Sequence, residues 1–271
     1  MKNITATSNR ISIILFAFIT LISAIAAAKD LTAKDIVQKS SEADKLSGWS
    51  AKIVMRLLPK SGQERIRESI ISNKLQPNGS DMQRLVHFVA PADINGTNIL
   101  IHEHQDGNDD IWIYLPSMKK VRRLLSNNRK DSFMGTDFSY TDITTPKVNE
   151  YVHTLLRRED AGGSSCFVIE SIPKTEQTRK DTGYSKTVNW IRADNYARVK
   201  AEIFDLSGGL SKTMQVHSLK EVDKQRGKWL MEKVEMRNLQ TGHTTMLLFN
   251  DIITSEALND KLFAPNRLDK E

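Results

Sequence analysis

The sequence predicts a mainly β protein built on one large antiparallel sheet that is curled or barrel-like. Many short segments rich in β-branched and aromatic residues alternate between apolar and polar positions, and Pro, Gly and Asn turn signals separate them. No helical segments alternate with these strands, which disfavours a parallel Rossmann or TIM arrangement. The composition agrees with a folded globular chain, since 39% of the 271 residues are hydrophobic and 27% are charged.

The beginning of the chain has the layout of a secretory signal peptide. Lys2 and Arg10 provide a positive start, an almost wholly apolar run follows, and Ala26-Ala27-Ala28 ends it as a small-x-small cleavage site. The alternative is an uncleaved anchor, because the apolar run with its alanines just reaches the length that spans a bilayer. We expect residues 1–28 to be removed and residues 29–271 to form one exported, soluble domain.

Residues 31–45 are predicted to form an opening helix. Thr32 can cap its first turn together with Asp35, and apolar residues then recur at helical spacing. From Trp49 onward the hydrophobic pattern changes to a period of two, which is typical of strands. The first series of predicted strands comprises residues 49–58, 63–75, 82–90, 97–104, 110–115 and 119–125.

A second series of strands follows an irregular segment, residues 126–147, that shows no clear period. These strands are predicted over residues 150–158, 165–172, 184–192, 198–206, 211–221, 228–238 and 243–251. A short helix over residues 255–263, ended by Pro265, closes the chain. Division into two domains near residue 147 is an alternative, but a single sheet needs fewer assumptions because no Pro- or Ser-rich linker separates the two series.

The sequence contains no G-x-S-x-G, H-E-x-x-H, P-loop or G-x-G-x-x-G motif, so we expect no enzyme and no cofactor. His102 and His104 share one face of a strand and could bind zinc with a third ligand, but no third His ligand is evident. The alternative is that both lie on the exposed face of a hairpin arm. Residues 106–110 resemble the opening of a calcium loop, yet the positions that need Gly and Glu hold Ile111 and Ser117. A turn between two strands is the simpler interpretation, and no metal site is predicted.

Cys166 is the only cysteine, which excludes an internal disulfide and a multi-cysteine metal site. It lies in an apolar strand, and nothing nearby in the sequence would stabilise a reactive thiolate. We therefore expect a small buried core residue at this position.

A basic run between Lys119 and Lys130 contains six cationic residues and no acid. Nucleic acid is the usual partner of such a patch, but export of the protein disfavours it, and anionic lipid head groups or an acidic protein surface fit better. The predicted docking residues are Lys119, Lys120, Arg122 and Arg123. A solvated turn is one alternative, and strand alternation could instead turn one of the two arginines inward.

Three motifs near the basic run carry a family resemblance: Ile-Trp-Ile-Tyr-Leu-Pro at residues 111–116, Lys-Val-Arg-Arg-Leu at residues 120–124, and the segment 133–143. Together with the opening helix, Trp190-Ile191 and Leu262-Phe263-x-Pro265, they resemble the outer-membrane lipoprotein-sorting protein family, whose relatives include the periplasmic carrier LolA and its receptor LolB. The resemblance implies an incomplete antiparallel β-barrel, or half-barrel, in which helices form a lid over an apolar cavity.

The resemblance also implies a periplasmic carrier that holds a lipid or a lipidated protein, works with an inner-membrane RND/MMPL-type lipid exporter and delivers toward the outer membrane. A shelter is physically reasonable, because burial stabilises an acyl chain by about 0.8 kcal/mol per CH₂. The alternative is a periplasmic accessory module that docks on a membrane transporter and binds no lipid. Lipid that copurifies with the protein would discriminate between the two, and for either role we expect a monomer.

Candidate cavity residues are aromatic and Met side chains of the strands and of the irregular segment. The predicted ligand-binding residues are Trp112, Tyr114, Trp190 and Phe204 on strands, and Phe133, Met134 and Phe138 at a mobile lid or mouth. Further strand candidates are Trp49, Met55, Phe88, Met214 and Phe249. Packing in the core is the alternative for each strand residue.

Overall fold

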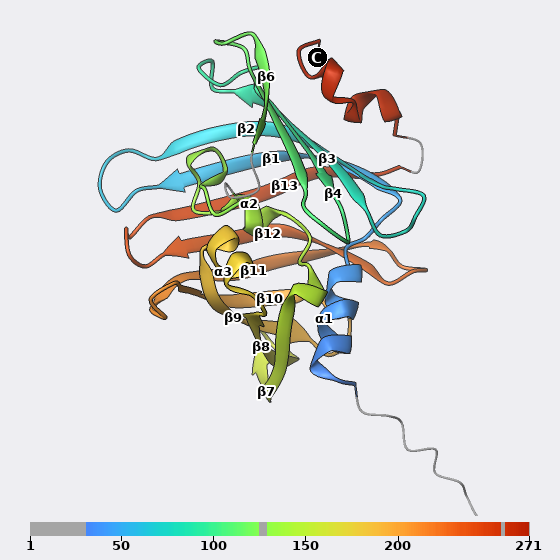
Figure 1. Ribbon diagram of the computed structural model, residues 1–271, viewed down its shortest axis with the longest axis vertical. Helices are drawn as coiled ribbons and strands as arrows, with labels where there is room; N and C mark the ends of the chain where they lie inside the picture. Colours follow the sequence, from blue (N-terminus) through green and yellow to red (C-terminus); the bar gives the residue numbers. More distant parts are fainter. Residues whose placement is uncertain (1–30, 125–128, 256–257, 271) are drawn as a thin grey trace, which may run out of the picture. The chain divides into compact units, whose positions relative to one another are not determined.

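The first and last strands of the chain pair with each other, and this pairing joins two antiparallel meanders into one sheet (Figure 1). The computed structural model describes residues 31–124, 129–255 and 258–270. The first meander contains β1 (Gly48–Leu58), β2 (Arg65–Leu75), β3 (Met82–Ala90), β4 (Asn98–Glu103), β5 (Asp110–Leu115) and β6 (Lys120–Leu124). The second contains β7 (Tyr151–Ala161), β8 (Ser164–Pro173), β9 (Tyr184–Arg192), β10 (Arg198–Asp205), β11 (Leu210–Asp223), β12 (Lys228–Asn238) and β13 (Thr244–Thr254).

The thirteen strands of the described chain follow the order β6-β5-β4-β3-β2-β1-β13-β12-β11-β10-β9-β8-β7. Every neighbouring pair is antiparallel. β6 and β7 lie at the two edges and do not pair with each other, so the sheet does not close into a barrel. This confirms the predicted mainly β fold, an incomplete antiparallel barrel in a single sheet.

The predicted strands are confirmed, and their ends differ from the prediction by a few residues. β7 continues to Ala161, where it pairs with Ser164, because Gly162 and Gly163 form a two-residue turn with φ values of 60° and 77°. Such a turn needs positive φ at both positions and brings the strands together up to the turn itself. Residue 125 of the predicted sixth strand lies outside the described residues.

The helices are few and short. The opening helix α1 (Ala33–Glu42) begins with a capping box, in which Asp35 N donates to Thr32 Oγ1 and Thr32 N donates to Asp35 Oδ2. Beyond the strands, the described chain also forms α2 (Tyr140–Ile143), α3 (Glu176–Thr182) and short 3-10 turns. None of the helices in the described ranges is long and apolar enough to cross a membrane.

One predicted helix is wrong, and one helix of the structure was not predicted. The predicted closing helix over residues 255–263 is wrong: the described residues form two 3-10 turns, Asp260–Phe263 and Pro265–Arg267, and Pro265 begins the second turn. Pro suits that first position because its missing N–H would have no partner there. Residues 256 and 257 of the prediction lie outside the described residues. Helix α3 was not predicted, although Thr175 caps its first turn and Gly183 ends it with φ of 77°.

The two faces of the sheet are covered differently. On the inner face, the main hydrophobic cluster combines residues of both meanders, among them Met55, Ile99 and Met236. On the outer face, Phe263 and Leu268 of the C-terminal turns cover part of the first meander. The inner cluster therefore makes the two meanders share one core.

Candidate ligand cavity

The chain between β6 and β7 must pass from one edge of the sheet to the other, because these strands lie at opposite edges. Its described part, residues 129–150, is called the crossover segment here and contains α2. Phe133, Phe138 and Tyr140 of this segment pack into the main cluster of the inner face. The crossover segment thus covers the inner face, where Figure 1 shows α2 in front of the strands.

A few polar contacts hold the crossover segment to the sheet. Asp137 N donates to Thr245 Oγ1 of β13 over 2.9 Å, and this hydroxyl in turn donates to Asp137 Oδ2 over 2.7 Å. Thr145 N donates to Glu103 Oε2 of β4 over 2.8 Å. The segment is therefore connected to both meanders at separate points.

The third contact is the buried side chain of Lys147. Its Nζ donates to the carbonyl oxygens of His104 and Gly107 and lies 2.8 Å from Asp109 Oδ1. These oxygens belong to the turn between β4 and β5, in which residues 106–110 resemble the opening of a calcium loop. An ammonium group of the same chain thus occupies the centre of that turn, and the simpler interpretation, a turn between two strands, is confirmed.

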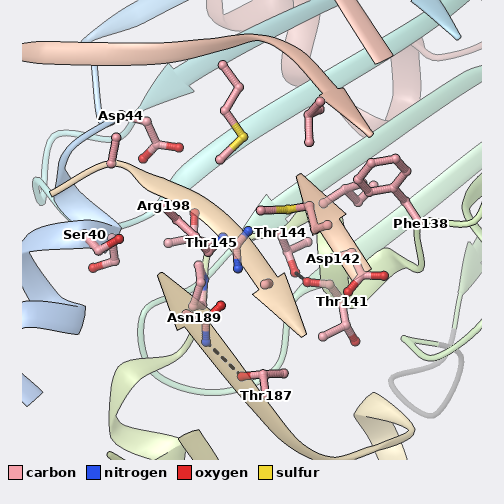
Figure 2. A pocket seen from close by; sticks show the side chains of 18 of the residues that line it. Ser40, Asp44, Phe138, Thr141, Asp142, Thr144, Thr145, Thr187, Asn189 and Arg198 are labelled. Atoms are coloured by element: carbon pink, nitrogen blue, oxygen red, sulfur yellow. Dashed lines mark hydrogen bonds between the residues drawn. The ribbon is translucent and has the colours of Figure 1, made fainter. Parts of the chain in front are cut away.

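A cavity of about 300 Å³ lies between the crossover segment, α1 and the inner face of the sheet. Figure 2 shows part of its lining, which comes from segments far apart in the sequence. Its volume is at the lower end of the roughly 300–1,000 Å³ that is usual for small-ligand sites.

The lining has an apolar side and a polar side. The apolar side comes from β1 and β11–β13 and includes Trp49, Ile53, Met55, Met214, Leu230, Val234, Met236, Leu247 and Phe249. Most polar side chains come from α1, the crossover segment and β7–β9, which also contribute apolar ones such as Phe133, Phe138 and Ile191. These polar residues include Ser40, Thr141, Asp142, Thr144, Tyr151, His153, Ser171, Thr187 and Asn189. An amphiphilic ligand could therefore place its chain and its head group on different sides.

Asp142 is the centre of a hydrogen-bond network on the polar side. Its Oδ2 accepts from Ser139 N and from the Tyr184 hydroxyl, each over 2.8 Å, and lies 3.5 Å from Lys212 Nζ. Burial raises the pKa of Tyr184 well above its usual value, so this hydroxyl remains a neutral donor. The network connects α2 to β9 and β11, and it compensates the charge of Asp142 directly.

Two oppositely charged side chains face the cavity without a direct partner. Among the described residues, no other residue forms a hydrogen bond or ion pair with the side chain of Arg198 on β10 or with that of Asp44 after α1. The Asp44 carboxyl accepts from its own backbone N–H. Burial lowers the pKa of Arg198, an effect that the charges of Asp142 and Asp44 oppose. Burial raises the pKa of Asp44, and the charge of Arg84 opposes that shift. Asp44 is an exposed residue, which limits the effect of burial on its carboxyl group.

The other cationic side chains of the lining each face an acid that lies outside it. Arg84 Nη2 lies 3.2 Å from Glu103 Oε1, and Lys147 pairs with Asp109 as described above. Arg129 Nη1 is 4.0 Å from Glu150 Oε2, and its buried Nε has no partner among the described residues. Arg198 therefore differs from these groups in having no ion pair.

Two of the predicted lid residues line the cavity. Phe133 and Phe138 are buried in its wall, and the Phe133 ring lies 5.5 Å from that of Tyr140, edge to face. Met134 is half-buried against the main cluster and outside the lining, with φ of 49° next to Gly135. Ligand contact by Phe133 and Phe138 remains a prediction with a suitable geometry.

The predicted strand aromatics lie away from the cavity, on the outer face. Trp112 and Tyr114 of β5 pack beside the C-terminal turns, and the Trp112 ring lies 4.9 Å from that of His102. Trp190 and Phe204 belong to an outer cluster with Cys166, where Lys200 Nζ lies 3.9 Å from the Trp190 ring centroid. The lining does not include these four aromatics, so we leave them out of the proposed site.

Several further strand candidates do line the cavity. Trp49, Met55, Met214 and Phe249 face it from β1, β11 and β13, whereas Phe88 is fully buried in the main cluster outside the lining. The same strands therefore place some large side chains at the cavity and others in the packed core, which residue type alone does not distinguish.

The predicted docking residues lie on and before the edge strand β6. Lys119, Lys120, Arg122 and Arg123 are all exposed, and Arg123 forms an ion pair with Asp110. The alternative in which Arg122 or Arg123 turns inward is therefore wrong. Arg129, later in the same basic run, is the arginine that is buried at the cavity.

His102 and His104 contact neighbouring protein groups, and Cys166 lies in the core. The His102 Nε2–H donates to the Phe263 carbonyl oxygen over 2.9 Å, and His104 lies between Asp81 and Asp110. No cluster of metal-ligating side chains occurs within the described ranges. Cys166 is fully buried, which confirms the predicted core position, and burial raises the pKa of its thiol.

Comparison with known proteins identifies relatives over nearly the whole described chain. The profile of a family described as "Uncharacterized protein" matches residues 80–270. A search of curated proteins found no match. A crystal structure of a candidate outer membrane lipoprotein-sorting protein domain from Vibrio parahaemolyticus is 30% identical, with a TM-score of 0.80, over 88% of this chain and 98% of that one.

Two further crystal structures have the same fold. A DUF1329 family protein from Desulfovibrio piger ATCC 29098 is 28% identical, with a TM-score of 0.80, over 87% of this chain and 97% of that one. A LolA superfamily protein, NE2245 from Nitrosomonas europaea, is 22% identical, with a TM-score of 0.67, over 86% and 98% of the two chains. At that identity the third structure supports the fold alone.

Proposed function

Because this chain belongs to the outer-membrane lipoprotein-sorting protein family, we propose that it is a periplasmic carrier for a lipid or a lipidated protein. The acyl part of the cargo occupies the cavity between the crossover segment and the inner face of the sheet. A carrier requires shelter from water and no catalytic group, which agrees with a sequence that has no catalytic motif.

The observation that carries this proposal is the apolar side of the cavity. Met55, Met236 and Phe249, from β1, β12 and β13, line it beneath the crossover segment, which polar contacts and buried aromatic side chains hold to the sheet. Apolar lining stabilises a buried acyl chain by about 0.8 kcal/mol per CH₂, and Met side chains adapt to chains of varied shape. A covering segment of this kind can admit and release a ligand without unfolding the sheet.

The proposal includes the route of the protein and its cargo. Residues 1–28 act as a cleaved signal peptide, and residues 29–271 are the mature periplasmic domain, which works as a monomer. The cargo comes from an inner-membrane RND/MMPL-type exporter and moves toward the outer membrane. The exposed basic residues on and before β6 offer a surface for docking to that exporter or to anionic head groups.

The test is binding of a fluorescent fatty-acyl probe to the mature protein below the critical micelle concentration of the probe. We expect saturable binding near a 1:1 ratio. Phe249→Glu places a charge in the lining and should weaken binding at least tenfold, whereas Leu248→Glu, at the adjacent position outside the lining, should not.

Native mass spectrometry of protein purified from its own periplasm, followed by lipid extraction, identifies the natural cargo. A folded protein that binds no acyl probe and carries no lipid would contradict the carrier proposal. That outcome would favour a module that docks on a membrane transporter and binds no lipid.

A further inference from the structure

We propose that the cavity selects amphiphiles with an anionic head group, a carboxylate or a phosphate, and that the guanidinium of Arg198 binds this head group inside the cavity. The inference rests on the proposed carrier function and names the chemical class of its ligand. It concerns the polar residues of the lining, which burial of an acyl chain alone would not require.

A β-bulge directs Arg198 into the cavity. On β10, Ala201 and Ile203 face the cavity, so strict alternation would direct Val199 inward and Arg198 outward. The pairing with β9 shifts register between Arg198 and Lys200, and Val199 packs in the outer cluster instead. Bulges redirect side chains in this way, and they are frequent beside functional sites. Figure 2 shows the resulting projection of Arg198 into the pocket.

The guanidinium of Arg198 retains its charge but has no direct partner. Arginine remains protonated in proteins, and among the described residues no hydrogen bond or ion pair reaches this side chain. The carboxylate of Asp142 is already occupied by Ser139, Tyr184 and Lys212. Arg198 lines the cavity, and its N–H donors remain available to a ligand there.

A second unsatisfied donor lies on the same side of the cavity. Arg129 is 7% exposed and lines the cavity, and its Nε has no partner among the described residues. Thr141 N donates to the Arg129 carbonyl oxygen over 2.9 Å, so Arg129 lies beside α2, the helix that carries Asp142. Arg129 and Arg198 thus both offer donors to the cavity, and a head group with several acceptor oxygens could accept from them.

Arg198 makes the cavity favour an anion over a cation, because the other three basic side chains of the lining each face an acid outside it. Four basic side chains, Arg84, Arg129, Lys147 and Arg198, and two acidic ones, Asp44 and Asp142, line the cavity. A neutral ligand that displaces water from Arg198 would leave a charge without compensation, whereas an anionic head group restores its hydrogen bonds. The cavity should therefore discriminate against neutral lipids by leaving Arg198 unpaired.

The experiment measures displacement of a fluorescent fatty-acyl probe from the full mature protein by dodecanoate, dodecyl phosphate, dodecanol and dodecyltrimethylammonium. All are used below their micelle concentrations or solubility limits. We expect both anions to bind about tenfold or more tightly than dodecanol, as charged hydrogen bonds predict, and the cation to bind most weakly. The ratio between the two anions shows whether carboxylate or phosphate is preferred, and inorganic phosphate alone should not displace the probe.

Variants test whether Arg198 causes the preference for anionic amphiphiles. Arg198→Gln should reduce the preference for dodecanoate over dodecanol to about twofold. Dodecanol should bind at least as tightly as before, because no guanidinium is left unpaired, and this retained binding also shows that the cavity is folded. Arg198→Lys should keep most of the preference, and Asp44→Asn should strengthen binding of the anions. The matched control Arg122→Gln removes the same charge from an exposed position on β6 and should change none of these affinities.

Three outcomes would overturn the inference. Equal binding of dodecanoate and dodecanol by the unmodified protein contradicts anion selection but leaves the carrier proposal intact. An unchanged preference for dodecanoate over dodecanol in Arg198→Gln excludes Arg198 as the residue that binds the head group. If inorganic phosphate displaces the probe as effectively as dodecyl phosphate does, the cavity contains a site for free phosphate. Binding of none of the four amphiphiles would reject the carrier proposal itself.

Discussion

Lys147 and Asp109 form an ion pair between the crossover segment and the turn that precedes β5. Their side chains are 5% and 2% exposed, and the ammonium is further held by two carbonyl oxygens. Asp109→Ala would leave the buried ammonium without its counter-charge. We expect this change to lower the free energy of unfolding by about 3–5 kcal/mol, measured by urea denaturation.

The control for this prediction is an ion pair on the surface. Glu64→Ala removes the partner of the solvent-exposed Arg56 and should change the unfolding free energy little, because water screens such pairs. An Asp109→Ala protein as stable as the Glu64→Ala protein would show that Lys147 finds another acceptor or reaches water.

At the scale of single residues, the sequence predicts burial better than function. Cys166 was placed in the core because its neighbours are apolar, and that reasoning is local. Arg198 could not be recognised as a cavity residue from the sequence, because its inward direction depends on a bulge that only the pairing with β9 defines. Trp112 and Trp190 were chosen for their aromatic character, but the curvature of the whole sheet decides which face becomes the cavity wall.

The C-terminal turns are held to the outer face by His102 of β4. Burial lowers the pKa of His102, so its ring is neutral in the folded protein, and its Nε2–H donates to the Phe263 carbonyl oxygen. Below about pH 6.5 the unfolded chain takes up a proton that the folded state resists. This contribution to stability is therefore present above that pH and is lost as the pH falls toward the lowered pKa.

His102→Gln should reduce the dependence of the unfolding free energy on pH between about pH 7 and pH 5. Gln keeps a side-chain N–H for the Phe263 carbonyl oxygen, so the variant tests ionisation more than the contact. Urea denaturation at several pH values measures the slope, and His243→Gln, at an exposed position, is the control. The same slope in His102→Gln and in the unmodified protein would assign the acid sensitivity to another group.

The crossover segment is held at β13 by the hydroxyl of Thr245, which is fully buried. Thr245→Val keeps the shape of the side chain but removes an acceptor for Asp137 N and a donor for Asp137 Oδ2. If this segment is the lid of a carrier, weakening one of its contacts should make opening easier. We expect association of an acyl probe to become several-fold faster, as stopped-flow fluorescence can measure.

The equilibrium affinity for the probe should change less than the rates, because the lining of the cavity remains in place. Thr241→Val, in the exposed turn before β13, is the control for the loss of a hydroxyl. Unchanged association kinetics in Thr245→Val, together with lower stability, would make the Asp137–Thr245 contact purely structural.

At the scale of elements, local signals predict hairpins well and terminal helices poorly. The strands between Gly and Pro turns were predicted correctly because a turn residue determines its own backbone φ, as the positive φ values of Gly162 and Gly163 after β7 show. The C-terminal segment, residues 255–263, was interpreted as one short helix that ends at Pro265. In the structure that segment takes its form from packing of Phe263 and Leu268 on the outer face, which is a tertiary effect.

At the scale of the whole molecule, the pairing of β1 with β13 determines where the cavity lies. This contact joins residues that are far apart in the sequence, so alternation within each strand could predict a single sheet but not the order of its strands. Once β6 and β7 are at opposite edges, the chain between them has to cross the inner face. The family resemblance implied a lid and a cavity, and the topology supplies the physical reason for both.

The open sheet leaves β6 as an exposed edge, and its basic side chains can serve two purposes. Cationic residues on an edge strand prevent pairing with other chains, which is their simplest role. They could also attract an anionic membrane or an acidic surface of the exporter. Exposed charges act over about 8 Å at physiological salt, so either attraction should weaken as salt is added, while acyl burial in the cavity should not.

We therefore expect the double variant Arg122→Glu, Arg123→Glu to bind anionic vesicles at least several-fold more weakly than the unmodified protein in a sedimentation assay. Added salt should weaken the unmodified protein in the same direction, and both proteins should bind an acyl probe equally. The control Lys233→Glu, Arg237→Glu reverses two exposed charges on β12, far from β6 in the strand order. Because the total charge change is the same, an equal loss in both double variants would show that net charge alone governs binding. Vesicle binding that does not depend on salt would leave protection of the edge strand as the role of these arginines.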